Sequence, residues 1–266
     1  MAAALVAVKL EIPCAHFEAG LRSFDRSMPE EINRMVADWV CDLLLTPSAD
    51  ADQNLLKEGV RSTATYRVGN VMNDTLLAHV DRAKQRTTLD DLGVARGDYV
   101  LTTLHLPSNV DDPLVIESLL SALDWIQERL AVVLPLHPRT RKRLKQLSLI
   151  ERANAMPNLK LTEPLGYLDF LALTAGSKHV LTDSGGLQEE TTVPGVPCFT
   201  MRPNTERPVT VSVGTNTIVG SDPHVIVDAV AETLAGHVKA GATPDLWDGR
   251  ASERVADVLV HRVSRG

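Results

Sequence analysis

Apolar residues between positions 99 and 219 are concentrated in short runs. Each run is followed by polar residues typical of a loop or by a segment with helical periodicity. The runs cover residues 99–105, 131–137, 159–165, 180–182, 196–201 and 216–219. Parallel strands that are buried on both faces show continuous rather than alternating apolar runs. The pattern therefore predicts an α/β fold with a doubly wound parallel sheet of about six strands and right-handed connections.

The segment ahead of residue 99 repeats this alternation on a smaller scale. Strands are expected at residues 12–17, 43–47 and 66–69, and helices at 29–40, 51–58 and 71–84. Residues 1–10 have the composition of a helix but no N-cap, as if the beginning of this sheet were missing. The polar stretch 85–98 is the best linker candidate, and helices at 223–235 and 252–263 are expected to close the chain.

Composition narrows the class of protein. The 266 residues are 44% hydrophobic and carry a net charge of −7, with a sequence pI near 5.6. This acidic balance argues against a nucleic-acid partner, which requires a basic face. The three cysteines show no metal-ligand spacing and favour a reducing compartment. The apolar opening "MAAALVAV" is too short to span a membrane and lacks a leading basic residue, so a cytoplasmic protein is expected.

The stretch "VLTDSGGLQEE" at residues 180–190 carries the strongest chemical signal at a strand end. Ligands of open α/β sheets bind beyond the carboxyl ends of the strands. There, Ser184, Gly185 and Gly186 would expose backbone N–H groups at a helix start, which suits a diphosphate, while Asp183 would cap the turn. Glu190, one turn into the helix, is placed to accept a ribose diol. An ordinary strand-to-helix turn with a first-turn acid remains the alternative.

Other candidates also follow strands. His105 and His137 end two strands, where proton transfer and a purely structural role are both open. Arg207 would clamp a phosphate or a uracil edge, or else pair with Glu206 on the surface. Glu18 and Glu30 lie at exits facing a presumed cleft, and two carboxylates with a histidine form a plausible acid/base set. Glu30 and Glu31 could instead be acids that simply favour the start of their helix. The basic run 139–143 is interpreted as a solvated helix face.

Taken together, these segments resemble the non-hydrolysing UDP-N-acetylglucosamine 2-epimerases. The matching stretches occur in family order over nearly the whole chain and are "HFEAGLRS", "MPEEINR", "YRVGNVMNDTLL", "TLHLPSNVDDP", "LHPRTRKRL", "YLDF", "LTDSGGLQEE" and "NTERPVT". The resemblance implies a GT-B architecture of two Rossmann-like domains. Residues 1–90 would be the remnant of the first, with helix 252–266 packing back on it, and residues 91–251 would form the nucleotide-binding domain.

The resemblance also implies the reaction and its residues. UDP-N-acetylglucosamine would be converted reversibly to UDP-N-acetylmannosamine by elimination and re-addition of UDP, with no metal or redox cofactor. The implied acid/base positions are Glu18, Glu30 and His105, with either carboxylate as the base. The implied UDP contacts are Phe170, Ser184, Gly185, Gly186, Glu190 and Arg207. The family also tends to form homodimers.

Two departures from the family pattern stand out. An N-terminal stretch with a glycine-rich turn and a Gly-Asp-Thr turn has no counterpart here, so the chain resembles a fragment, for which we expect weak or absent activity. Leu106 replaces the arginine that usually follows the family histidine, which argues against regulation by a second nucleotide sugar. Three other readings stay open at this point: a GT-B glycosyltransferase that uses a UDP-sugar, a hydrolysing 2-epimerase, and an inactive UDP-binding remnant.

Overall fold

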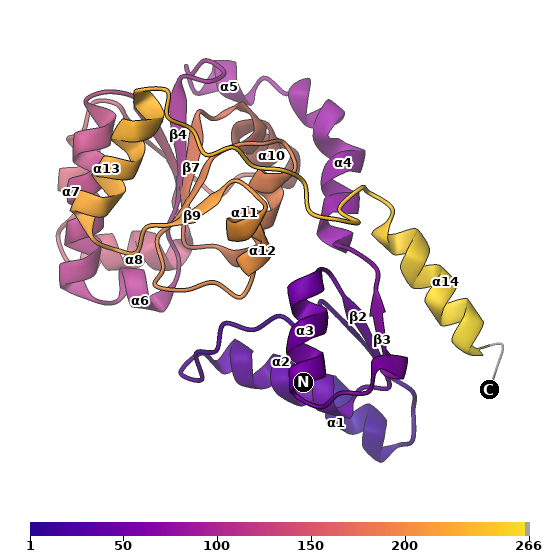
Figure 1. Cartoon of the computed structure of the whole chain (residues 1–266). Helices are drawn as coiled ribbons and strands as arrows, with labels where there is room; N and C mark the ends of the chain where they lie inside the picture. Colours follow the sequence, from indigo (N-terminus) through magenta and orange to yellow (C-terminus); the bar gives the residue numbers. More distant parts are fainter. Residues whose placement is uncertain (264–266) are drawn as a thin grey trace. The chain divides into compact units, whose positions relative to one another are not determined.

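The computed structural model describes residues 1–263, and Figure 1 traces the order of its elements. The chain divides into two compact units. Unit 1 comprises Met1–Ala78, Thr205–Ser212 and the described residues from Thr243 onward, and unit 2 comprises His79–Asn204 and Val213–Ala242. The boundary at residues 90 and 91 that the sequence suggested stays a prediction, and the last three residues of the expected segment 252–266 lie outside the described part.

Unit 2 is built on a six-stranded sheet in the order β6-β5-β4-β7-β8-β9, and all of its pairings are parallel. The strands are β4 (Tyr99–Thr103), β5 (Ala131–Pro135), β6 (Leu159–Thr162), β7 (His179–Thr182), β8 (Cys198–Thr200) and β9 (Asn216–Ile218). This order, with the switch of direction beside β4, is that of a doubly wound sheet. The predicted parallel sheet of about six strands is confirmed.

Helices cover both faces of this sheet (Figure 1). On one face, Val100 and Val132 pack in a core with α7 (Pro113–Gln127) and α13 (Pro223–Leu234). On the other, Leu101 and Val133 pack against α10 (Tyr167–Gly176) and α11 (Gly185–Thr192). Neighbouring strand residues thus enter opposite cores, which explains why the strands are continuously apolar. The remaining helices of unit 2 are α5 (Thr88–Asp91), α6 (Pro107–Val110), α8 (Pro138–Gln146) and α9 (Ile150–Asn154).

Residues 85–98 are not a free linker. They contain α5, and Val94 is buried while Leu89 and Leu92 pack against the core that holds Tyr99 and Leu101. The segment therefore belongs to the core of unit 2, because its few apolar side chains are spaced to reach that core. The polar composition of the segment concealed this packing.

Unit 1 contains a three-stranded parallel sheet in the order β1-β2-β3. Its strands are β1 (Ala15–Phe17), β2 (Leu43–Thr46) and β3 (Thr65–Arg67). Its helices are α1 (Ala2–Lys9), α2 (Pro29–Val40), α3 (Ala49–Lys57), α4 (Val71–Lys84), α12 (Pro208–Ser212) and α14 (Ala251–Val263), and the residues of α4 from His79 onward belong to unit 2. A 3₁₀ turn, η1 (Ser62–Ala64), precedes β3. Strand β1 is shorter than the predicted 12–17, because Pro13 has no N–H to donate to a ladder.

The last helix of unit 1 is held by contacts with segments far from it in the sequence. Val255 packs with Leu45 and Val68, and the Trp247 indole donates to the carbonyl of Pro47 at 3.0 Å. Asp74 accepts hydrogen bonds from the first backbone N–H groups of α14. These contacts place α14 beside β2 and β3.

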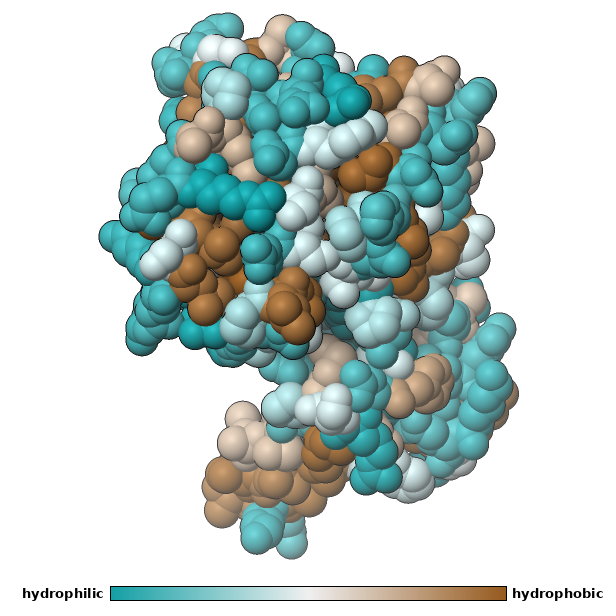
Figure 2. Space-filling view, turned by 90° about the vertical axis from the view of Figure 1, so that its left-hand side faces the viewer, coloured by the Kyte–Doolittle hydropathy of each residue, from teal (hydrophilic) through white to brown (hydrophobic). Residues whose placement is uncertain are grey.

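Helix α1 buries none of its residues. Leu5, Val6, Val8 and Leu10 are among the exposed large apolar side chains, and Figure 2 shows brown, apolar atoms gathered at the bottom of the view, where this helix lies. Strand β1 is also at the edge of its sheet. Among the described residues, no helix is long and apolar enough to cross a membrane.

Candidate functional site

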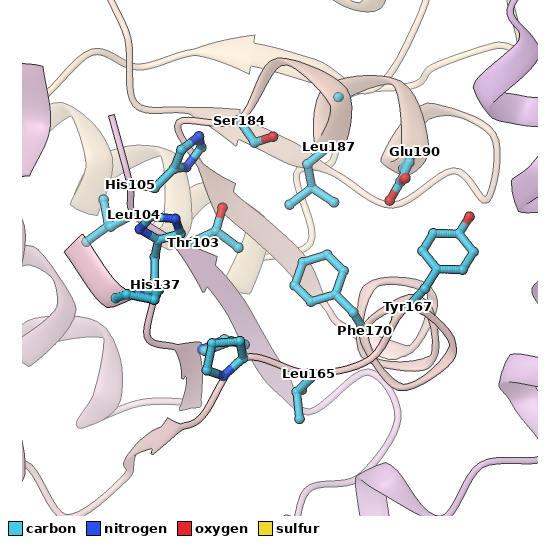
Figure 3. A pocket seen from close by; sticks show the side chains of 14 residues that line it. Thr103, Leu104, His105, His137, Leu165, Tyr167, Phe170, Ser184, Leu187 and Glu190 are labelled. Carbon is cyan, nitrogen blue, oxygen red and sulfur yellow. The ribbon is translucent and has the colours of Figure 1, made fainter. Parts of the chain in front are cut away.

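A cavity of about 600 Å³ opens at the carboxyl ends of β4, β5, β6 and β7 in unit 2. This is the edge at which open α/β sheets bind ligands. Figure 3 shows the two histidine rings together on one side of it and Phe170, Tyr167 and Glu190 on the other. Five of the predicted site residues line it, namely His105, Phe170, Ser184, Gly186 and Glu190, and His137 lines it as well.

The start of α11 presents backbone N–H groups to this cavity. Ser184 precedes the helix in an extended conformation, its side chain makes no capping hydrogen bond, and the first turn holds no acidic residue. Gly185 begins the helix but is not among the residues that line the cavity. A Cβ added at Gly186 would meet nothing within 4 Å. The absence of a side chain there is therefore not a packing requirement of the fold, and it leaves room for a ligand at a helix start that favours anions.

Glu190 lies across the cavity on the same helix. Burial raises the pKa of its carboxyl group, and no hydrogen bond to its carboxylate occurs within residues 1–263. Burial and, to a smaller extent, the charge of Glu190 raise the pKa of Tyr167. Phe170 packs partly into the core below and offers a ring to the cavity. A carboxylate beside an aromatic surface suits a ribose with an adjoining base.

His105 is held by a buried carboxylate on the neighbouring strand end. Its Nδ1 lies 2.7 Å from Oδ1 of Asp183, which is fully buried. Oδ2 of Asp183 accepts the backbone N–H groups of His105 and Leu106, each at 2.9 Å. The hydrogen bond to Asp183 and its charge raise the pKa of His105, and they outweigh burial and Arg202, which lower it. With Nδ1 facing Asp183, Nε2 is the ring nitrogen left for a bound anion, to which only the imidazolium form of His105 can donate.

His137 is placed differently, although it follows β5 as His105 follows β4. Its Nδ1 accepts a hydrogen bond from the backbone N–H of Arg139 and caps α8. The two histidine ring centroids are 5.9 Å apart. His137 thus combines a structural role with a position on the cavity wall. The basic run 139–143 is largely paired: Arg139 with Asp111, and Arg141 with Glu163.

Unit 1 holds a second, smaller cavity of about 240 Å³. Glu18 and Glu30, the two predicted acid/base carboxylates, both line it, together with His16, Asn33, Arg34 and Arg207. Glu31 is instead buried and accepts hydrogen bonds from the Ser23 N–H, the Ser23 hydroxyl and the Phe24 N–H. The structure therefore gives these two neighbours different tasks: Glu31 holds a loop, and Glu30 faces the cavity.

Arg207 lies in unit 1 and contacts Glu18. Its guanidinium pairs with Glu206 and lies 3.4 Å from Oε2 of Glu18. It lines the cavity of unit 1 and is not among the residues that line the cavity of unit 2. The roles assigned to all the site residues from the sequence, including a UDP contact for Arg207, stay predictions.

Asp183, which the sequence suggested would cap the turn before α11, instead accepts hydrogen bonds from the N–H groups of His105 and Leu106. Asp38 and Arg34 were not picked out from the sequence. Asp183 and Asp38 act through contacts with segments 18 to 78 positions away, for which no local pattern gives a signal. Arg34 ends the quoted motif "MPEEINR", so a signal was present. Burial lowers the pKa of Arg34, and its Nη1 makes no hydrogen bond to the described residues. Within the described part, no cluster of three potential metal ligands occurs.

Comparison with known proteins gives a consistent match. The family model described as UDP-N-acetylglucosamine 2-epimerase matches residues 1–260. The UDP-N-acetylglucosamine 2-epimerase of Methanocaldococcus jannaschii is 40% identical over 266 residues, which cover 98% of this chain and 72% of that protein. A UDP-2,3-diacetamido-2,3-dideoxy-D-glucuronate 2-epimerase of Pseudomonas aeruginosa is 42% identical over 263 residues, covering 97% and 71%.

Solved structures agree. The M. jannaschii UDP-GlcNAc 2-epimerase in complex with UDP-GlcNAc and UDP superposes with a TM-score of 0.90, at 40% identity over 98% of this chain and 72% of that chain. The Neisseria meningitidis enzyme bound to UDP-GlcNAc gives 0.86 at 29% identity, over 98% and 73%. The predicted α/β fold class of the GT-B type is confirmed by these neighbours.

Proposed function

The chain belongs to the UDP-N-acetylglucosamine 2-epimerase family, and we propose that it inverts C2 of UDP-N-acetylglucosamine by elimination and re-addition of UDP. The observation that carries this proposal is the cavity of unit 2. It combines an open helix start at Gly186, the carboxylate of Glu190 and the His105–Asp183 pair. These groups suit the diphosphate, the ribose diol and the negative charge that develops on the diphosphate as UDP departs.

In this scheme the diphosphate binds at the Ser184–Gly185–Gly186 turn, where the helix N–H groups and dipole favour an anion. The Glu190 carboxylate accepts the ribose hydroxyls, and Phe170 lies against the uracil. Asp183 raises the pKa of His105, and in its imidazolium form His105 donates from Nε2 to the diphosphate as negative charge develops on departing UDP. Arg207 is proposed as a further UDP contact by family resemblance.

The carboxylates of unit 1 supply the proton chemistry. Either Glu18 or Glu30 removes the proton from C2 as the C1–O bond to UDP breaks, which leaves a 1,2-unsaturated sugar. Re-addition of UDP to C1, with a proton delivered to the opposite face of C2, gives the epimer. Their shared cavity supports both assignments, and the reaction calls for no metal or redox cofactor.

The groups proposed to bind UDP do not identify the sugar, because both cited relatives are named for 2-epimerisation of UDP-sugars. We propose N-acetylglucosamine because the matching family model and the structures bound to UDP-GlcNAc carry that sugar. A parallel assay with the diacetamido-glucuronate nucleotide tests this choice.

Incubation with UDP-N-acetylglucosamine in D₂O is the test. Epimerisation incorporates deuterium at C2, because the abstracted proton exchanges with solvent. A glycosyltransferase would leave hydrogen at C2. A hydrolysing 2-epimerase would release stoichiometric UDP and free N-acetylmannosamine, and a remnant that only binds would show UDP binding by calorimetry without turnover. Either of the last two results, or retained hydrogen, contradicts the proposal.

We propose further that the protein is a cytoplasmic homodimer. Three free cysteines, two of them partly exposed, are typical of proteins from a reducing compartment. The dimer rests on the resemblance to the family. Light scattering coupled to size exclusion measures the assembly directly, and a mass of one chain at micromolar concentration would contradict it.

A further inference from the structure

Asp38 is a fully buried carboxylate on α2 that the proposed chemistry does not use. Its Oδ1 lies 2.6 Å from Nδ1 of His16. Its Oδ2 accepts the backbone N–H of Gly20 at 3.2 Å and lies 2.6 Å from Nη1 of Arg22. Three donors from one short segment therefore converge on a single side chain.

That segment has an unusual backbone. Glu18 adopts a left-handed conformation with φ of 57°, which costs a non-glycine residue about 1–2 kcal/mol. Gly20 follows with φ of 80°, and a Cβ there would lie 2.4 Å from the carbonyl oxygen of Ala51. A turn with two left-handed residues persists only where the surroundings determine it.

Asp38 bonds to both sides of this turn. His16 precedes Glu18 by two residues, and Gly20 follows it by two. The other contacts of the turn hold one side each: the Ala19 N–H donates to the carbonyl of Leu45, and Asn54 donates to the carbonyl of Gly20.

Arg22 extends the arrangement toward α3. Its Nε and Nη2 form a two-pronged pair with Glu58 at 2.8 and 2.7 Å. Burial alone would lower the pKa of Arg22, but hydrogen bonds and charge from Glu58 and Asp38 outweigh it and raise the pKa. The guanidinium therefore stays charged and holds Oδ2 of Asp38, whereas His16 contacts Oδ1. Besides these groups, Cys41 and Asp42 lie near the same end of α2.

We infer that Asp38 is a positioning residue, which fixes the turn after β1 so that the Glu18 carboxylate is directed into the cavity of unit 1. The inference deepens the proposed function, because Glu18 is one of its two candidate bases. A base must be held within a fraction of an ångström of the proton it removes, and a displacement of 1 Å can cost about 100-fold in rate.

The test uses the full chain with Asp38→Asn, which keeps the size of the side chain and removes its charge. His16→Phe is a milder second variant, because this side chain is 23% exposed and its loss leaves the Arg22 contact in place. Asp42→Asn is the matched control, since the Asp42 carboxylate accepts a hydrogen bond from the N–H of Cys14, which lies ahead of the turn. Glu18→Gln and the double variant with Asp38→Asn complete a cycle.

Two readouts separate the inference from the proposed function. The first is NMR of the Gly20 amide and of the Glu18 side-chain carboxyl, which needs no turnover. In Asp38→Asn the Gly20 amide proton should move upfield and the Glu18 carboxyl resonance should shift, while both stay in place in Asp42→Asn. The second is deuterium incorporation at C2, for which kcat should fall roughly 10- to 100-fold with KM within about threefold.

The double-mutant cycle distinguishes a positioning role of Asp38 from a merely structural one. A loss of folded protein would lower the rate by the same factor with or without Glu18, whereas a positioning role predicts that Asp38→Asn costs nothing further in Glu18→Gln. Unchanged Gly20 and Glu18 resonances in both Asp38→Asn and His16→Phe would overturn the inference, as would an additive cycle. Absence of exchange in the wild-type chain would instead overturn the proposed function, and the resonances would still decide whether Asp38 sets the turn.

Discussion

His179 in β7 is a buried base without a hydrogen-bond partner among residues 1–263, and its replacement by leucine should stabilise unit 2. The residue is 0% exposed, and neither ring nitrogen forms a hydrogen bond to the described part of the chain. Its ring meets Phe199 edge-on, with centroids 5.5 Å apart. Leucine has similar volume and removes two buried polar atoms, so a gain of about 1–3 kcal/mol is expected at pH 7.5.

The gain should grow in acid. Burial, with a smaller contribution from Lys178, lowers the pKa of His179 from 6.5 to about 3. Below pH 6.5 the unfolded chain therefore binds a proton that the folded chain does not, and stability falls until the pH approaches 3. At pH 5.0 the loss is about 1.36 kcal/mol for each of 1.5 pH units, or about 2 kcal/mol. His179→Leu should escape this loss.

Urea unfolding followed by circular dichroism at pH 7.5 and 5.0 measures both effects. If the two units unfold separately, the transition that the substitution shifts is the relevant one. Exposed His224 on α13 provides the control, since His224→Leu should change neither the stability nor its pH dependence by more than about 0.5 kcal/mol. The reasoning fails if His179→Leu is destabilising, or if its advantage over the wild type is the same at both pH values.

Further predictions concern the two cavities. Gly186→Ala should leave the melting temperature within a few degrees of wild type and weaken UDP binding by at least about 10-fold in calorimetry, because the added methyl meets only ligand. Glu190→Gln should weaken UDP by roughly 10- to 100-fold but leave 2′,3′-dideoxy-UDP unaffected; equal losses for both ligands would exclude a ribose contact. Asp183→Asn should lower the pKa of His105 in an NMR titration. Since that pKa is raised in the folded protein, the lost stability should be larger at pH 5.5 than at pH 8.5. Glu31→Gln should cost about 1–3 kcal/mol of stability, whereas Glu30→Gln should leave stability unchanged and reduce deuterium incorporation; the reverse pattern would contradict the assignment of the two carboxylates.

The central strands β4, β5 and β7 were predictable because their consecutive apolar residues enter the two cores in turn, as Val100 and Leu101 do. The short helices α5, α6 and α12 were missed, since segments of four or five residues carry no helical periodicity. Residues 85–98 were misread for a related reason: three spaced apolar side chains among polar ones suffice to pack against the sheet.

The site residues that could be predicted stand where a motif and a strand end coincide, as Ser184, Gly186, Glu190 and His105 do. Asp183 and Asp38 could not be given their roles, because those roles consist of hydrogen bonds to residues distant in sequence. The family resemblance singled out Glu30 rather than Glu31, but the task of Glu31 could not be predicted, since only the fold brings it to Ser23. The sequence motif thus identifies residues near the site, whereas their individual roles depend on contacts that only the folded chain makes.

The most direct measurement of the central claim starts the reaction from both sides in D₂O. UDP-N-acetylglucosamine and UDP-N-acetylmannosamine, supplied separately, should converge on the same mixture in ¹H NMR spectra, with deuterium at C2 in both sugars and UDP still attached. Convergence without deuterium, or accumulation of free UDP and free sugar from either starting compound, would contradict the account.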